Sequence, residues 1–253
     1  MERVIALRLR RAELEAAAAA VPAGPPFGVT LRGPNVRVIA EVKRKSPSKG
    51  SINPGLDAAA QAEFYEEGGA AAISVLTEPR HFGGSNHDLE SVRSRVRIPL
   101  LKKDFHVDEV QIFEARALGA SAALLIARAI EPTALPRLVA LAERIGLETL
   151  VEVRSTDELE RALGAGARVV GVNCRNLETL EVDAAVARQL IGRIPAGVVA
   201  IWESGISTPD DVRAAASAGA DAVLVGSSIS ASPDPAGAVR ALAAIPRQDA
   251  PRG

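Results

Sequence analysis

The sequence contains little cysteine, aromatic residue or lysine, and its charges nearly cancel. A single cysteine, Cys174, excludes an intramolecular disulfide and a zinc site built from several cysteines. Aromatic residues make up only 3% of the 253 residues, which argues against the stacking surfaces that bind single-stranded nucleic acid. The formal net charge of −1 gives no field of one sign that would attract nucleic acid or an anionic membrane.

Long hydrophobic runs are also missing, since none reaches the roughly 20 residues of a membrane span. Residues 1–20 carry Glu and Arg among their apolar positions, which is unlike a secretory signal. Hydrophobic residues nevertheless make up 47% of the chain, enough for a sizeable core. We expect a cytoplasmic globular protein that binds neither membranes nor nucleic acid and, lacking an apolar surface stripe, is a monomer.

Short apolar runs alternate with segments of helical period along most of the chain. The runs are typical of strands buried on both faces: Val36–Lys43, Ala71–Leu76, Pro99–Lys103, Ala122–Ala127, Thr149–Val153, Val169–Asn173, Val198–Trp202 and Ala222–Val225. The segments between them predict helices: Ala58–Glu67, Asn86–Arg95, Asp108–Leu118, Pro132–Ile145, Thr156–Leu163, Asp183–Ile191, Pro209–Ala218 and Pro235–Ala244. Ser155 and Thr208 precede acidic first turns and read as helix caps.

The alternation predicts an α/β fold, a single (β/α)8 TIM barrel. A glycine that ends a helix and leads directly into the next strand recurs in GGAAAISV, LGASAALLI, AGARVVGV and AGADAVLV. An open doubly wound sheet is the alternative, but its first strand usually precedes a glycine-rich turn, and here KRKSPSKG follows. We assign the barrel to residues 36–245, an N-terminal helical extension to residues 1–35 and a C-terminal tail to residues 246–253. The extension is expected to consist of one amphipathic helix and a loop that together cap the barrel.

The few lysines are concentrated in two short segments. All five lie in EVKRKSPSKG and LLKKDF, whereas the rest of the chain uses arginine. Arginine is permanently protonated, while a lysine can be tuned into a proton donor, a base or a Schiff-base amine. Compositional drift would also produce this distribution, but the clustering favours a functional role.

Polar residues end several of the predicted strands, where a barrel of this kind places its active site. Because side chains alternate along a strand, Glu41 and Lys43 share the inward face, as do Leu101 and Lys103. Lys102 is expected to face outward and to extend its amine to solvent. Each inward group taken alone could be a structural ion pair, but together they indicate an active site: Glu41, Lys43, Lys103, Glu152, Asn173 and Glu203.

Two Gly/Ser loops follow the seventh and eighth strands, at Glu203–Ile206 and Val225–Ser228. In TIM barrels this pair of loops often holds a phosphate, because glycine lets the ligand approach the backbone and serine adds a hydroxyl donor. Ordinary tight turns are the alternative. The three histidines show no metal-ligand spacing, so we expect no metal site.

The first of these strands resembles a known family signature. IAEVKRKSPSKG at residues 39–50 is similar to the first-strand motif Glu-x-Lys-x-x-Ser-Pro-Ser of indole-3-glycerol phosphate synthases. The resemblance continues in the same order through LTE, FGGS, LLKKDF, LVEV, VNCRNL, ESGI and VGSS, over residues 36–245. It departs from the family at Trp202 and Cys174, both expected to face the helices, and in a short N-terminal segment.

The resemblance implies a lyase of tryptophan biosynthesis that converts 1-(2-carboxyphenylamino)-1-deoxyribulose 5-phosphate to indole-3-glycerol phosphate, with loss of CO2 and water and without cofactor or metal. It implies catalytic roles for Glu41, Lys43, Lys103, Glu152, Asn173 and Ser204. It implies substrate binding by Ser46, Phe82, Phe105, Leu124, Arg175 and Glu203, and phosphate binding by Gly205, Gly226 and Ser227.

By the same resemblance Lys103 is the general acid at the substrate ketone, and we expect apolar surroundings to lower its pKa. Glu152, Lys43 and Glu41 are candidates for the later proton transfers. Two other functions stay open: another phosphosugar enzyme, such as a phosphoribosyl isomerase or a Schiff-base aldolase, and a non-catalytic phosphate-ligand binder. The Glu-x-Lys and Ser-Pro-Ser run argues against an isomerase, and the retained acid–base set argues against a pure binder.

Overall fold

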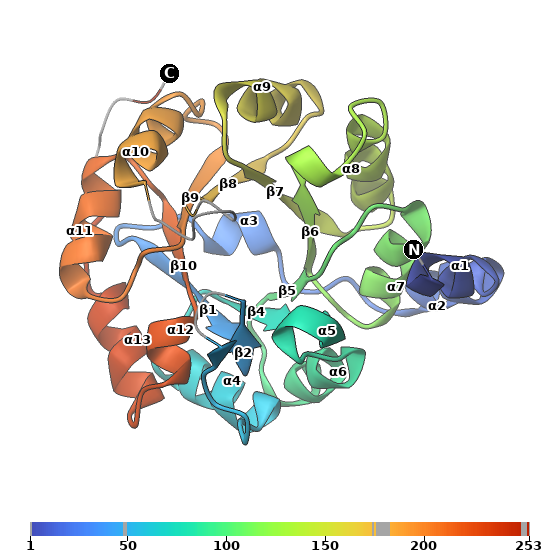
Figure 1. Ribbon diagram of the computed structural model, residues 1–253, viewed down its shortest axis with the longest axis horizontal. Coiled ribbons are helices and arrows are strands. Elements are labelled where there is room, and N and C mark those ends of the chain that lie inside the picture. Colours follow the sequence, from blue (N-terminus) through green and yellow to red (C-terminus); the bar gives the residue numbers. More distant parts are fainter. Residues whose placement is uncertain (1, 48–49, 174, 176–182, 249–251, 253) are drawn as a thin grey trace.

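A computed structural model describes residues 2–47, 50–173, 175, 183–248 and 252. Within them a closed barrel of parallel strands is ringed by helices (Figure 1). The strands run around the barrel in the order β1-β10-β9-β8-β7-β6-β5-β4. Their bounds are β1 Arg37–Val42, β4 Ala72–Leu76, β5 Leu100–Lys103, β6 Ala122–Ile126, β7 Glu148–Val153, β8 Val169–Asn173, β9 Val199–Glu203 and β10 Ala222–Val225. The predicted (β/α)8 fold is confirmed.

Helices between consecutive strands cover the outside of the barrel. They are α4 Ala58–Glu67, α6 Asn86–Arg95, α7 Glu109–Ala117, α8 Leu135–Arg144, α9 Thr156–Gly164, α10 Ala184–Gly192, α11 Pro209–Ser217 and α13 Pro235–Ala243. Shorter elements lie in the loops: α5 Pro79–Phe82, α12 Ser227–Ser230, the 3-10 turn η1 Ala127–Ala129 and the hairpin of β2 Lys45–Ser46 with β3 Gly50–Ser51. The two predicted caps are confirmed, since the Ser155 and Thr208 hydroxyls accept hydrogen bonds from the amides of Glu158 and Asp211.

The apolar core forms two layers, as the alternation of side chains requires. On β1, Ile39 belongs to the cluster inside the barrel, while Val38 and Ala40 belong to the cluster between strands and helices. The inner cluster is small because each strand contributes only every second side chain. The polar side chains at the carboxyl ends of the strands lie beyond this inner layer and form the mouth of the barrel.

The end of the barrel opposite this mouth is closed by α3, Phe27–Thr30. Phe27 and Leu31 are completely buried in the inner cluster. The backbone amides of Phe27 and Gly28 donate to the Glu148 carboxylate at 2.6 and 2.9 Å, at the start of β7. Figure 1 shows α3 behind the ring of strands. The N-terminal segment therefore supplies the plug of the barrel.

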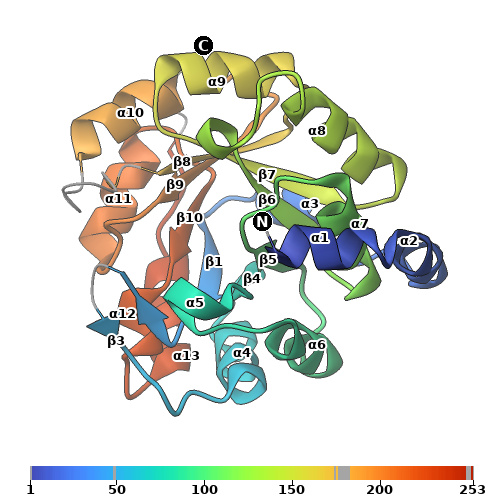
Figure 2. The ribbon, with the colours of Figure 1, turned by 45° about the vertical axis from the view of Figure 1, so that its right-hand side comes forward.

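The prediction of one N-terminal helix is wrong, because the structure has two, α1 Glu2–Arg8 and α2 Arg11–Ala20. No proline or glycine marks the interruption, so we attribute it to tertiary contacts on both sides of it. Arg8 and Arg11 pair with Asp108 and Glu109, next to and in α7. Both helices lie beside α7 on the outside of the barrel, as Figure 2 shows.

None of the helices formed by the described residues combines the length and the apolar character that a bilayer crossing requires.

Candidate active site

The residues predicted at the strand ends lie together around two adjoining cavities at the mouth of the barrel. One cavity, of about 170 Å³, is lined on one side by apolar groups. The other, of about 100 Å³, is lined by the Gly/Ser loops. Both share the same ionic wall: Glu41, Lys43, Lys103, Arg175 and Ser204. The alternation of strand side chains therefore places the predicted groups on one surface.

Two lysines and two glutamates form the centre of this wall. The Lys43 Nζ lies 2.8 Å from Glu41 Oε1, and the Lys103 Nζ lies 3.4 Å from Glu41 Oε2. The same Lys103 Nζ lies 3.4 Å from Glu203 Oε2. Glu41 and Glu203 are buried, whereas both lysines keep part of their side chains accessible from the cavity. The carboxylates thus hold the two ammonium groups beside the space that a substrate would fill.

The prediction of a lowered pKa for Lys103 is wrong. Burial lowers this pKa, but the carboxylates of Glu41, Glu203 and Glu152 outweigh burial and raise it above its ordinary value. The surroundings are not apolar, because β1, β7 and β9 bring three glutamates toward the amine from across the mouth of the barrel. Lys103 therefore stays an ammonium ion at any ordinary assay pH.

Burial and charge act in opposite directions on the two glutamates. Burial raises the pKa of Glu41, but Lys43 and Lys103 outweigh it and bring the pKa to about 2. Burial also raises the pKa of Glu203. The positive charge of Lys103 lowers this pKa, the negative charge of Glu152 raises it further, and the pKa is brought to about 8. Glu41 is therefore always ionised, while Glu203 changes charge within the range of ordinary assays.

A chain of hydrogen bonds runs across the ends of the next strands. The Asn173 side-chain amide donates to Glu152 Oε1 at 3.1 Å. Its oxygen accepts a hydrogen bond from the Ser204 hydroxyl at 3.0 Å and one from the Arg175 backbone amide at 3.1 Å. Asn173 therefore orients the buried Glu152 carboxylate and the Ser204 hydroxyl toward the same cavity.

Apolar side chains also line the larger cavity. Phe82, Phe105 and Leu124 all line it, as the sequence predicted, and Phe105 is 45% exposed. The predicted Ser46 also lines this cavity. A cavity lined by both apolar and ionic side chains suits a substrate with an aromatic ring and charged or hydroxylated substituents.

The predicted phosphate residues Gly205, Gly226 and Ser227 line the smaller cavity. Gly205 and Ser204 both have positive φ angles, 76° and 68°, which turn the chain sharply after β9. A Cβ atom at Gly226 would lie only 2.4 Å from Glu41 Oε1. The lack of a side chain at Gly226 therefore lets the loop after β10 approach the Glu41 carboxylate closely.

The prediction for Lys102 is correct in the direction of the side chain and wrong in its exposure to solvent. Its side chain faces outward, but it is completely buried and does not reach solvent. Its Nζ lies 3.0 Å from Asp104 Oδ2 and 3.1 Å from Glu114 Oε2. Two buried carboxylates on the outer face of the strand hold the amine inside the protein.

Several residues that line the cavities were not predicted from the sequence. They are Pro47, Leu76, Glu78, Asp104, Ile126, Ser207 and Leu224, whereas Ile206 and Ser228 lie in the two predicted loops. Strand alternation would have found Leu76 and Ile126, because they share a face with Ser74 and Leu124. Glu78 carries a different signal, since it precedes Pro79 and caps α5 by accepting from three backbone amides.

Trp202 faces the helices, as predicted, and its indole N–H donates to the Ser204 carbonyl at 3.1 Å. Cys174 lies outside the described residues. Among the residues that the structure describes, no group of three or more His, Cys, Asp or Glu side chains is arranged to hold a metal ion.

Comparison with known proteins identifies the family of this site. The family model of indole-3-glycerol phosphate synthase matches residues 2–242, which include every strand of the barrel. The chain belongs to the indole-3-glycerol phosphate synthase family. Indole-3-glycerol phosphate synthase 1 of Streptomyces coelicolor is 56% identical over 214 residues, covering 85% of this chain and 80% of the relative. The synthase of Streptomyces griseus is 51% identical over 232 residues, covering 92% and 86%.

Among solved structures, a thiamine phosphate pyrophosphorylase from Pyrococcus furiosus superposes with a TM-score of 0.63. The alignment covers 84% of this chain and 95% of that one, with 18% sequence identity. At this identity the likeness concerns the fold alone. It agrees with the barrel described above.

Proposed function

We propose that the protein converts 1-(2-carboxyphenylamino)-1-deoxyribulose 5-phosphate to indole-3-glycerol phosphate, with release of CO2 and water. The observation that carries the proposal is Lys103, an ammonium ion held between Glu41 and Glu203 beside two adjoining cavities, one with apolar side chains and one lined by the Gly/Ser loops. Membership of the synthase family supports the same reaction. The substrate has the three matching parts: an aromatic ring, a ketone and a phosphate.

Ring closure forms a bond between the aromatic carbon and the ketone carbon, so the ketone oxygen needs a proton. We assign this proton to the Lys103 ammonium ion, which lies between the apolar wall and the carboxylates. Its raised pKa does not prevent the transfer, because the oxygen becomes an alkoxide, which is more basic than an amine. Glu41 and Glu203 direct the N–H bonds of Lys103 and shield the developing charges.

The remaining steps are loss of CO2, which restores the aromaticity of the benzene ring, and loss of the new hydroxyl group as water, which with loss of a ring proton completes the pyrrole ring. An acid must protonate the leaving hydroxyl, and a base must take the last ring proton. Lys43 and Glu152 supply these roles in our proposal, because they face the same cavity from opposite sides of Lys103. Glu41 orients the lysines and donates no proton, since its pKa of about 2 keeps it ionised.

Substrate positioning follows from the walls of the two cavities. The aromatic ring would rest on Phe82, Phe105 and Leu124, and its carboxylate would lie near Arg175 and Ser46. The phosphate would lie at Gly205, Gly226 and Ser227, and Asn173 with Ser204 would orient the middle of the chain.

A Schiff-base aldolase using Lys103 fits this geometry poorly. Imine formation needs an uncharged amine, whereas three carboxylates keep Lys103 protonated. Reduction with borohydride in the presence of substrate tests this directly, and covalent labelling of Lys103 would favour the aldolase. A monomeric state, a cytoplasmic location, independence of metal and cofactor, and domain boundaries at residues 35 and 245 stay predictions.

An indole-fluorescence assay with the carboxyphenylamino-ribulose phosphate tests the proposed function. We expect turnover by the unmodified protein and a loss of about 10²- to 10⁴-fold in kcat for Lys103→Met, the effect of removing a general acid. Lys45→Met is the matched control, because Lys45 is a half-buried lysine that lines neither cavity and donates to the Arg80 carbonyl. A normal rate for Lys103→Met, or no turnover by the unmodified protein, would refute the proposal.

A further inference from the structure

The outer face of β5 carries a buried group of charges directly behind Lys103. Lys102 and Asp104 flank Lys103 in the chain. The Lys102 side chain lies on the face of β5 opposite to the substrate cavity, whereas Asp104 follows the end of β5, lines that cavity and also contacts Lys102. Lys102 is completely buried between the carboxylates of Asp104 and Glu114. Arg3 of α1 adds a second cation, with its Nη2 2.6 Å from Asp104 Oδ2 and 3.3 Å from Glu114 Oε2. Two cations thus balance two carboxylates.

Asp104 has more partners than charge balance requires. Its carboxylate also accepts a hydrogen bond from the Thr77 hydroxyl at 2.6 Å and one from the Phe105 backbone amide at 2.8 Å. The Thr77 backbone amide donates in turn to the Lys103 carbonyl at 3.1 Å. The end of β4, the Lys103 carbonyl and the start of the Phe105 loop are therefore all linked through one carboxylate.

Glu114, by contrast, contacts Lys102, Arg3 and Asn86 in the described part of the chain, and none of these three residues lines the cavities. Its oxygens pair with Lys102 and Arg3 and accept from the Asn86 side-chain amide at 3.0 Å. These contacts connect α7 to α6 and to α1. Glu114 balances charge in the same group, while only Asp104 reaches Thr77 and Phe105.

We propose that Asp104 is a positioning residue for the synthase reaction, fixing the backbone that directs Lys103 into the cavity and Phe105 along its apolar wall. The inference rests on the function proposed above. Lys102 and Arg3 hold the Asp104 carboxylate in one orientation, and Thr77 and Phe105 transmit that orientation to the site. Small displacements of a catalytic group have large effects on rate, about 100-fold for 1 Å.

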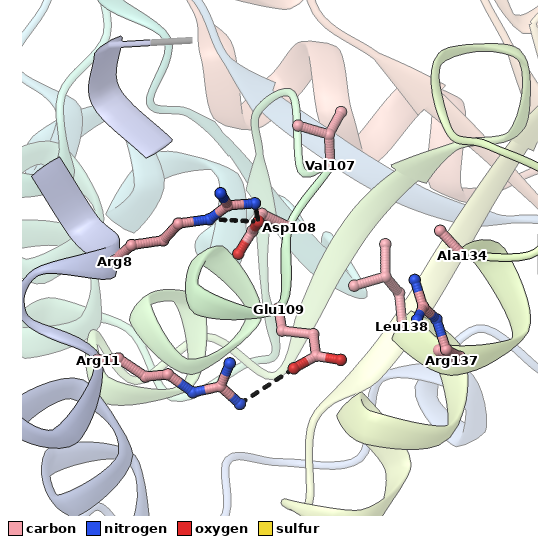
Figure 3. A pocket seen from close by; sticks show the side chains of 8 residues that line it. All are labelled: Arg8, Arg11, Val107, Asp108, Glu109, Ala134, Arg137 and Leu138. Carbon is pink, nitrogen blue, oxygen red and sulfur yellow. Dashed lines mark hydrogen bonds and ion pairs between the residues drawn. The ribbon is translucent and has the colours of Figure 1, made fainter. Parts of the chain in front are cut away.

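The N-terminal helices also form exposed ion pairs with the chain around Asp108 and Glu109, and these pairs differ from the buried contacts of Asp104. Figure 3 shows Arg8 paired with Asp108 and Arg11 with Glu109 beside a cavity of about 500 Å³. These arginine side chains are 65% and 51% exposed, so solvent screens both ion pairs. Neither pair touches Asp104, so Arg8→Ala removes a tie between α1 and the loop without altering the buried carboxylate.

The test compares Asp104→Asn with Glu114→Gln, which make the same change from carboxylate to amide in the same buried group. We expect Asp104→Asn to lower kcat by about 10- to 100-fold with less than about a threefold change in KM. Glu114→Gln and Arg8→Ala should keep kcat within about twofold of the unmodified protein, although Glu114→Gln should lower Tm. Thr77→Val removes only the hydroxyl donor and should lower kcat several-fold. This variant tests the inference if Asp104→Asn does not fold.

Crystal structures of the variants provide a readout that does not need the reaction. Asp104→Asn should displace the Lys103 Nζ from its 3.4 Å contacts with Glu41 and Glu203, and Glu114→Gln should not. An unmoved Lys103, or equal kcat values for Asp104→Asn and Glu114→Gln, would overturn the inference. Absence of turnover by the unmodified protein would instead overturn the proposed function, and the position of Lys103 would still decide the inference.

Discussion

At the scale of single residues, the environment of each carboxylate sets its role. Glu152 is buried at the carboxyl end of β7 and accepts from Asn173, whereas Glu148 begins the same strand and caps the backbone amides of Phe27 and Gly28. The two glutamates are four residues apart on one strand and share its inward face. Substitutions at Glu152 and Glu148 can therefore be compared to separate an effect on catalysis from an effect on stability.

We expect Glu152→Gln to lower kcat far more than it raises KM, because a glutamine cannot transfer a proton. Glu148→Gln should lower Tm and leave kcat close to normal, since it weakens only the contact to α3. Steady-state kinetics and thermal unfolding of both variants check this. A rise in KM alone for Glu152→Gln would contradict the acid–base assignment.

Glu203 predicts a pH dependence of the reaction. Its pKa of about 8 means that it is mostly protonated at neutral pH and becomes charged above pH 8. The new negative charge beside Lys103 makes that ammonium ion a weaker acid and repels an anionic substrate. We expect kcat/KM to fall above about pH 8 and Glu203→Gln to remove this fall. A profile with the same alkaline limb in both proteins would contradict the assignment.

At the scale of secondary-structure elements, the N-terminal segment has two separate functions in the fold. Its helices α1 and α2 pack on α7, and α3 closes the end of the barrel opposite the mouth. Periodicity predicted helix in this region but did not predict its division. These helices contact residues about 100 positions away in the sequence, through packing on α7 and ion pairs with Asp108 and Glu109.

The plug at α3 leads to a stability prediction. Phe27→Ala removes a completely buried ring from the inner layer and should lower the free energy of unfolding by about 3–5 kcal/mol. The site lies at the opposite end of the barrel, so kcat of the folded protein should change little. Val29→Ala is the matched control, because Val29 belongs to the same helix and is 70% exposed. Urea unfolding of both variants measures the difference, and equal stabilities would exclude the role of Phe27 as a plug.

At the scale of the whole molecule, opposing pKa shifts limit the stable pH range. Asp104 and Glu114, like Glu41, have folded-state pKa values below their ordinary ones: burial raises each pKa, and the neighbouring cations outweigh burial. Their contribution to stability is present above the unfolded pKa of about 4 and is lost as the pH falls through the folded values. Glu203 has the opposite shift, so its contribution is present below about pH 4 and is lost as the pH rises toward 8.

We therefore expect a maximum of Tm at about pH 5, with an acid limb below it and an alkaline limb that falls from about pH 5 to pH 8. Thermal unfolding followed by circular dichroism from pH 3 to pH 9 measures this profile. Glu203→Gln should flatten the alkaline limb, because the glutamine does not titrate, and leave the acid limb unchanged. An unchanged alkaline limb in this variant would show that other groups cause the loss of stability.

The sequence by itself determined the order of strands and helices, the barrel and the surface on which Glu41, Lys43, Lys103, Glu152, Asn173 and Glu203 meet. Local periodicity is sufficient for this, because alternation along a strand decides which side chains face inward and the topology brings the strand ends together. Only the tertiary structure decided the charge state of Lys103, the burial of Lys102, the break between α1 and α2, and the contacts of Asp104. Each of these depends on groups that are distant in the sequence and close in space, and electrostatic interactions act through the distance in space.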